Sequence, residues 1–203
     1  MNNARQATKK SPALAWALVT TLVLGSAQVQ ARPTVLEQQL PSAEAPAGQL
    51  ELAFSPREGA EALVLKVIAS ARRDIKVLAY SFTSFHVTRA LLDKAKAGVS
   101  IALVADAEEN TSKDRSGKAR AALSALADAG VDVRLISVYA SHHDKVMVID
   151  GQTVQTGSFN YSSAAEERNS ENVLVHWANP ALATAYLQHF QRNYAQSQPF
   201  RAR

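Results

Sequence analysis

Short apolar runs alternate with longer amphipathic stretches from residue 49 onward, and this alternation restricts the possible fold more than any other feature of the sequence. The runs that predict strands cover residues 50–54, 75–82, 99–105, 131–137, 146–149, 152–156 and 173–177. Helices are predicted at residues 58–72, 87–97 and 181–194. A further helix is predicted after a polar loop at 106–117 and ends at Gly130. Nearly continuous apolar strands between helices predict an α/β domain whose mixed, largely parallel sheet is flanked by helices on both faces.

The first 31 residues have the three parts of a secretory signal peptide. A basic start precedes an apolar run over residues 13–24, and Ala31 ends an A-x-A-like cleavage site. Because this run is shorter than the roughly 20 residues of a membrane span, an uncleaved N-terminal anchor is the less favoured alternative. We therefore expect an exported protein, periplasmic or secreted, with a flexible lead-in at residues 32–48 and one domain at residues 49–203.

The overall charge does not identify a partner once the leader is set aside. The chain has 22 basic and 18 acidic side chains, and because the leader holds three basic and no acidic ones, 19 remain against 18. Evidence for nucleic-acid binding must therefore come from where charges cluster. The chain has no cysteine, which excludes thiolate catalysis and cysteine-ligated metal sites.

The sharpest motif reads His-x-Lys, then four apolar residues, then Asp. His143 and Lys145 begin it, and Asp150 ends it directly before a glycine. Adjacent residues of a strand face opposite sides, so we expect His143 and Lys145 to project to one side and Asp144 to the other.

A second short strand follows and ends in Gly157-Ser158-Phe159-Asn160. By the same alternation Ser158 and Asn160 share a side, and Glu171 stands at the start of the next strand. The ends of two consecutive strands thus present an imidazole, an ammonium, a hydroxyl and an amide.

These residues resemble the phospholipase D superfamily, which is defined by H-x-K-x-x-x-x-D with G-S/G-x-N downstream. The chain is most similar to the single-motif bacterial endonuclease branch (Nuc-like, EDTA-resistant nucleases) and to the related mitochondrial cardiolipin hydrolases. The similarity extends over essentially the whole mature chain and includes residues 79–83 and 169–172. It implies a phospholipase D-like catalytic domain that cleaves phosphodiesters without a metal or any other cofactor.

Cleavage of an anionic phosphodiester needs a strong nucleophile, fixed positive charge and a proton for the leaving oxygen. A neutral histidine is a competent nucleophile near neutral pH, which suits His143. Lys145 and Asn160, with Ser158 as a further donor, would hold the phosphoryl oxygens. A carboxylate on the second ring nitrogen would fix the tautomer of the imidazole, and the resemblance assigns that part to Glu171.

One histidine cannot readily serve as nucleophile and leaving-group acid in the same step. Family members with two motif copies solve this within one chain, whereas this chain has one copy. The resemblance therefore implies a homodimer in which two His143 side chains face one phosphate and one of them becomes phosphohistidine. We expect Asp150, although part of the motif, to fix the turn at the strand end rather than to act in catalysis.

Two further groups of side chains are candidates for substrate binding. Tyr80, Ser81 and Thr83 follow an apolar strand, where pockets form in α/β proteins, and their alternative is a buried strand end. Lys113 and Arg115 would hold outlying nucleic-acid phosphates if their loop borders the site, and would otherwise form a solvated surface.

A metal site at His142, His143 and Asp144 is not expected, since adjacent strand residues face opposite ways and Lys145 would repel a cation. The histidines without a partner pattern, for which we expect core or surface roles, are His86, His176 and His189.

The sequence thus predicts a non-specific endonuclease that cuts DNA, with RNA as a further substrate. A phospholipase D that acts on anionic phospholipids is the alternative, because both substrates present a phosphodiester. A nucleic-acid-binding module without turnover is disfavoured, since binding alone does not require a nucleophile.

Overall fold

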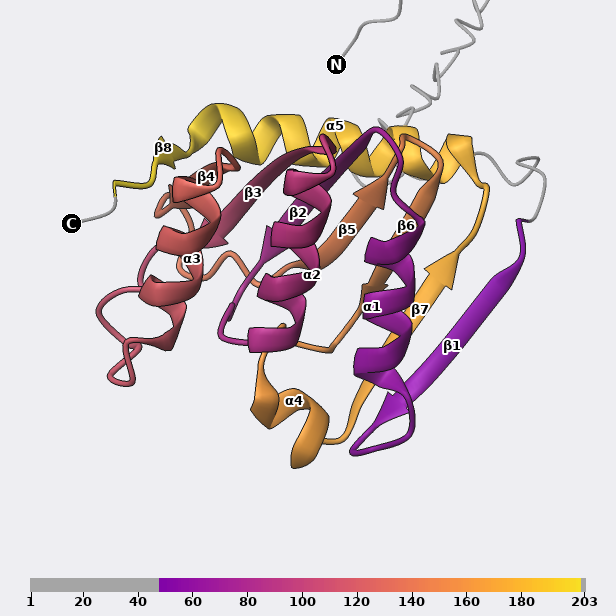
Figure 1. The fold of residues 1–203 in the computed structure, drawn as a ribbon, viewed down its shortest axis with the longest axis horizontal. Helices are drawn as coiled ribbons and strands as arrows, with labels where there is room; N and C mark the ends of the chain where they lie inside the picture. Colours follow the sequence, from indigo (N-terminus) through magenta and orange to yellow (C-terminus); the bar gives the residue numbers. More distant parts are fainter. Residues whose placement is uncertain (1–47, 202–203) are drawn as a thin grey trace, which may run out of the picture.

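The computed structural model describes residues 48–201 of the 203-residue chain. The predicted signal peptide and most of the predicted lead-in lie outside the described residues. Eight strands form one sheet in the order β1-β7-β6-β5-β2-β3-β4-β8 (Figure 1). Their bounds are β1 Leu50–Ser55, β2 Asp74–Ala79, β3 Ser100–Asp106, β4 Asp132–Ile136, β5 Lys145–Ile149, β6 Thr153–Gly157, β7 Glu171–His176 and β8 Gln198–Pro199.

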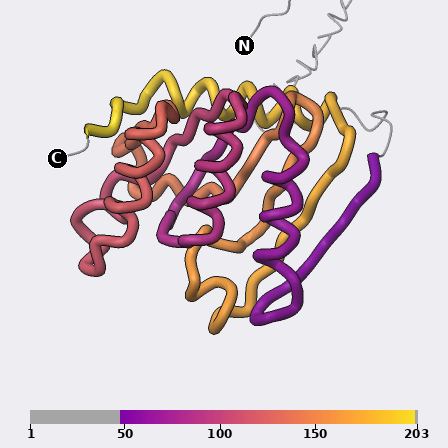
Figure 2. Tube along the Cα trace, viewed as in Figure 1, coloured from indigo at the N-terminus to yellow at the C-terminus, as the bar shows by residue number. Residues whose placement is uncertain are grey.

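Helices cover both faces of the sheet, as the sequence predicts. The five helices are α1 Ala60–Ser70, α2 Phe85–Lys96, α3 Lys118–Asp128, α4 Ser163–Glu167 and α5 Pro180–Gln196. The first three lie side by side on one face, and α5, yellow in Figure 2, runs across the strands on the other. Two apolar clusters result, with Val64 and Val67 of α1 in the first and Phe190 of α5 in the second. No helix within residues 48–201 combines the length and apolarity needed to cross a membrane.

The prediction of a largely parallel sheet is wrong. Only the β2–β3 and β3–β4 pairs are parallel, and the other five pairings are antiparallel. The prediction failed because a continuous apolar strand reports burial on both faces and not strand direction. In β5, Val146 and Val148 pack under α5 while Met147 and Ile149 pack under the other helices. The short turn at 150–152 that joins β5 to β6 permits only an antiparallel pair.

Four strand ends meet at one edge of the sheet, which we call the site edge. It is formed by the C-terminal ends of β2 and β6 and the N-terminal ends of β5 and β7, with Ala79 paired to Lys145 and Gly157 paired to Val173. Gly157 has a φ of 146°, and a Cβ there would lie 2.2 Å from the Asn172 carbonyl oxygen. Only glycine fits where the backbones of β6 and β7 approach so closely.

Asp150 lies at the opposite end of β5 from the site edge. Its carboxylate accepts hydrogen bonds from the backbone N–H groups of Arg72, Arg73 and Asp74, at 2.9, 2.8 and 2.9 Å. Burial raises the pKa of this carboxyl, but the three N–H donors outweigh burial and leave the pKa below its ordinary value of 3.8. Asp150 thus connects the α1–β2 loop to the end of β5 through hydrogen bonds. This position is structural and lies away from the cleft described below.

We expect Asp150→Ala to lower the free energy of unfolding by about 2–4 kcal/mol, because three backbone N–H donors would lose their charged acceptor. Since the folded-state pKa is lowered, this stabilisation is present above the ordinary carboxyl range and is lost as the pH falls through the folded pKa. Urea denaturation at pH 7, and at a series of pH values from 4 down to 2, measures both effects. Asp128→Ala, at an exposed helix end, is the control and should change stability by less than about 0.5 kcal/mol. An Asp150→Ala protein of full stability would contradict this role.

Candidate active site

The five residues that the sequence predicts to be catalytic line one open cleft at the site edge. The cleft has a volume of about 540 Å³. Its lining residues are His143, Lys145, Gly157, Ser158, Asn160, Glu171 and Asn172. They come from the beginning of β5, the end of β6 and the beginning of β7, so the sheet register, and not a single local segment, brings them together.

Tyr80 links the imidazole and the ammonium of the motif. Its ring centroid lies 4.5 Å from that of His143, with the planes tilted by 51°, and the Lys145 Nζ lies 4.8 Å from the Tyr80 ring. Lys145 is buried and donates from Nζ to the His143 carbonyl oxygen at 2.8 Å. Burial lowers the pKa of Lys145, and nearby carboxylates, Asp144 first among them, act in the opposite direction. His143 is exposed at the surface of the cleft, where a substrate can reach it.

Ser158 and Asn160 project into the cleft as hydrogen-bonding groups. The Ser158 Oγ accepts from the Asn172 backbone N at 3.1 Å and from its Nδ2 at 3.2 Å, which leaves the hydroxyl proton available to a ligand. The Asn160 Oδ1 is buried and has no partner within the described residues. Sequence reasoning gave no role to Asn172, because only the β6–β7 register shows that it contacts Ser158.

Glu171 lines the cleft but does not orient the His143 ring. Its Oε1 accepts from the Asn169 Nδ2 at 3.0 Å, and no hydrogen bond joins it to His143 within residues 48–201. The carboxylate instead contributes negative charge that raises the pKa of Lys145. The orientation of the imidazole must therefore come from other contacts in this protomer.

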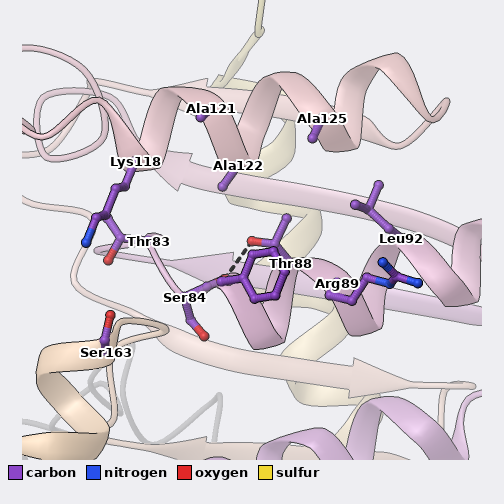
Figure 3. Close-up of a pocket in the computed structure, with 11 residues that line it drawn as sticks. Thr83, Ser84, Thr88, Arg89, Leu92, Lys118, Ala121, Ala122, Ala125 and Ser163 are labelled. Carbon is purple, nitrogen blue, oxygen red and sulfur yellow. Dashed lines mark hydrogen bonds between the residues drawn. The ribbon is translucent and has the colours of Figure 1, made fainter.

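The three candidates after β2 separate. Tyr80 contacts the motif residues, and half-buried Ser81 follows it. Thr83 lies on another groove, between α2 and α3, whose floor is Ala121, Ala122 and Ala125 (Figure 3). This groove has a volume of about 460 Å³, and its lining includes Arg89 and Lys118 but no histidine and no carboxylate.

A buried asparagine that sequence reasoning missed holds the segment after β2 in place. The Asn110 side chain donates to the Tyr80 carbonyl oxygen at 2.5 Å and accepts from the Phe82 backbone N at 2.8 Å. It is fully buried and also donates to the Asp106 carbonyl oxygen. No spacing in the sequence indicates this role, because Asn110 sits in a polar loop. The two residues that it holds in place, Tyr80 and Phe82, precede it by 30 and 28 residues.

The loop with the predicted basic residues borders the cleft through an acidic residue. Burial raises the pKa of Tyr80, and the nearby Glu109 carboxylate of this loop raises it further. Lys113 pairs with Glu108 at 3.1 Å, and both side chains are exposed, as is Arg115. The loop therefore approaches the cleft with both signs of charge. Within residues 48–201, no three His, Asp or Glu side chains are arranged to hold a metal ion.

Comparison with known proteins agrees with the fold. Residues 64–194 match the family model described as cardiolipin synthase, PLD-like domain. The chain is 34% identical over 137 residues to a protein named phospholipase D from Rickettsia bellii, which covers 68% of this chain and 65% of the relative. It is 30% identical over 137 residues to the mitochondrial cardiolipin hydrolase of Danio rerio, covering 67% of this chain and 57% of that protein. The chain thus spans 57% to 65% of the length of these relatives, which is less than two thirds.

Solved structures give the same placement. Nuc from Salmonella typhimurium, a phospholipase D family member, is 39% identical with a TM-score of 0.72, and the match covers 75% of this chain and 98% of Nuc. NucT from Helicobacter pylori is 25% identical with a TM-score of 0.66, and the match covers 75% of this chain and 99% of NucT. The chain therefore belongs to the phospholipase D superfamily, in its single-motif, Nuc-like branch.

Proposed function

We propose that the protein is a metal-independent phosphodiesterase that cuts nucleic acid, chiefly DNA and also RNA, through a phosphohistidine intermediate. The observation that carries the proposal is the convergence of His143, Lys145, Ser158 and Asn160 on one open cleft. These groups are the nucleophile and the donors that a phosphoryl transfer needs in place of a metal.

In the first step, an imidazole nitrogen of His143 attacks phosphorus, and the bond to the leaving oxygen breaks. The ammonium of Lys145, the amide of Asn160 and the hydroxyl of Ser158 stabilise the charge on the phosphoryl oxygens. Water then attacks the phosphorus atom, so that a P–O bond forms and the P–N bond breaks, which returns the imidazole and releases the phosphate-bearing product.

The leaving oxygen needs a proton, and the cleft within the described residues offers one imidazole. We propose that a second copy of the chain supplies the other, so that two His143 rings face one phosphate across a two-fold axis. The second ring protonates the leaving oxygen and then, as a base, activates the water. The surface exposure of His143 is consistent with a partner that reaches it.

Two substrate classes fit the same chemistry. The names of the solved relatives, Nuc and NucT, favour nucleic acid. The names phospholipase D and cardiolipin hydrolase among the curated relatives favour a phospholipid. We place nucleic acid first because the cleft is open and lined by polar side chains. The more apolar groove lined by Thr83 is a separate pocket, so it does not add an apolar surface for lipid chains to the lining of the cleft.

A substrate panel tests the proposal. The purified protein without its first 31 residues is offered plasmid DNA, single-stranded DNA, RNA and cardiolipin vesicles, in the presence of excess EDTA. We expect cleavage of DNA and RNA with chelator present. Hydrolysis of the vesicles alone would establish the lipid alternative, and activity that requires a specific divalent ion would contradict metal-independent chemistry.

The role of the loop cations is tested by salt dependence. If Lys113 and Arg115 contact DNA phosphates, Lys113→Ala/Arg115→Ala should reduce the slope of log K against log salt by about one unit per lost contact. Binding is measured in a His143→Asn background, which prevents cleavage. Lys96→Ala, an exposed lysine at the far end of α2, is the matched control and should keep the full slope. An unchanged slope in the double variant would place the loop away from the substrate.

A further inference from the structure

A second group of charged residues lies behind the motif, on the opposite side from the cleft. Asp144 stands between two cleft residues in sequence, but its side chain faces α5. Its Oδ2 lies 2.7 Å from the Nε2 of His189 on α5 and 3.6 Å from the Nδ1 of His142. These contacts join the motif to a helix that contributes nothing to the lining of the cleft.

The contacts of His189 determine which ring nitrogen carries its proton. The Nδ1 is hydrogen-bonded to the Nη2 of Arg192, while the Asn193 Nδ2 lies 3.4 Å from Nδ1 and 3.3 Å from Nε2 and so does not distinguish the two nitrogens. A guanidinium can only donate, so the Nδ1 must accept. The proton of the neutral ring is then on Nε2 and points at Asp144. Arg192, His189 and Asp144 thus form one directed chain of hydrogen bonds.

The backbone around the nucleophile is fixed from two sides. The backbone N of His142 donates to the Asp106 Oδ2 at 2.8 Å, at the end of β3. Two residues later, Asp144 is held by His189 from α5. The His143 ring itself makes no hydrogen bond within residues 48–201 and only packs on Tyr80. Its position therefore depends on how firmly the main chain on either side of it is held.

We propose that Asp144 and His189 are positioning residues for the reaction: the pair fixes the main chain that presents His143 and Lys145, and its carboxylate supports the charge of Lys145. The inference rests on the proposed function for its kinetic tests. Asp144 acts through its two sequence neighbours, and His189 acts through Asp144. Neither side chain touches the substrate.

The charge effect has a definite sign. Lys145 is faced by Asp144 from its own segment, Glu171 from β7, Glu109 from the loop after β3, and the uncharged Tyr80 ring from the segment after β2. Burial raises the pKa of Asp144, but the hydrogen bond from His189 and nearby positive charge outweigh it, so the pKa lies below 3.8. The carboxylate is therefore ionised at neutral pH. Removing it lowers the pKa of Lys145 further, and activity that needs the ammonium is then lost at a lower pH.

Three variants separate position from charge. His189→Ala removes the donor, His189→Gln keeps an N–H near the place of Nε2, and Asp144→Asn keeps the shape but removes the charge. Steady-state kinetics with bis(4-nitrophenyl) phosphate give kcat, KM and the pH profile of each variant. His176→Ala is the control histidine, because His176 ends β7 away from the site edge and does not line the cleft.

We expect His189→Ala to lower kcat on the order of 10- to 100-fold with little change in KM, because a misplaced nucleophile costs that much. His189→Gln should recover most of the loss, and neither should move the alkaline limb of the pH profile. Asp144→Asn should lower kcat and also move that limb to lower pH. His176→Ala should match the wild type in every respect.

Two results would overturn the proposal. One is a folded His189→Ala protein, with an unchanged unfolding midpoint, that keeps the wild-type kcat. The other is an Asp144→Asn protein whose Lys145 titrates as in the wild type, measured by NMR of ¹³C-labelled lysine. The titration needs no turnover, so it still decides the charge claim if the protein cleaves no phosphodiester, a result that would refute the proposed function instead.

Discussion

Replacing His143 with alanine is expected to abolish phosphodiester cleavage, with a fall in kcat of roughly 10⁴-fold or more. The imidazole is the group in the cleft that can form a covalent bond to phosphorus at neutral pH. Lysine and amide donors alone would still bind the substrate, so the affinity for DNA should change by less than about ten-fold. Single-turnover cleavage and equilibrium binding measure the two effects separately.

The control for this prediction is His86→Ala. His86 is exposed on α2 and pairs with Glu61 at 2.8 Å, away from the cleft. It should leave cleavage unchanged. A His143→Ala protein that keeps more than a tenth of the wild-type rate would show that another group performs the attack.

The second large effect is expected when wild-type subunits are mixed with His143→Asn subunits. If the reaction needs two imidazoles at one phosphate, only dimers with two wild-type chains are active. An equal mixture that assorts at random then keeps about one quarter of the activity of the same total amount of wild-type protein. If each subunit works alone, about one half remains. The measurement requires full subunit exchange, which tagged subunits and affinity separation can verify.

The mixing experiment also isolates the mixed dimer. Purified through two different tags, it should have less than about one hundredth of the wild-type activity, because its single intact imidazole cannot both attack and protonate. Half activity in the mixed dimer, or full activity in a monomer, would contradict a shared site.

Much of the fold follows from local periodicity. The apolar residues of α1, Val64, Val67 and Ile68, recur at helix spacing and do pack on the sheet. The order of strands and helices was therefore predictable. The direction of the strands was not, since β5 is buried on both faces whatever its partners, and register is decided by turns and distant pairings. The short helix α4 and strand β8 also lack a pattern long enough to recognise.

The cleft was more predictable than its supports. His143 and Lys145 share a short segment, and Ser158 and Asn160 share another, so strand alternation and strand ends suffice to bring them together. The supporting contacts join residues that are far apart in sequence. The His189–Asp144 contact spans 45 residues and the Asn110–Tyr80 contact spans 30. A lone histidine on a helix carries no signal of such a contact.

The central claim is that His143 carries the phosphoryl group during turnover. A direct test mixes the protein with a ³²P-labelled phosphodiester and quenches the reaction rapidly without acid. Peptide mass spectrometry then locates the phosphate. We expect phosphate on residue 143, stable in base and labile in acid, and none in the His143→Asn protein. A time course through the burst phase that shows product without any phosphate on residue 143 would contradict it.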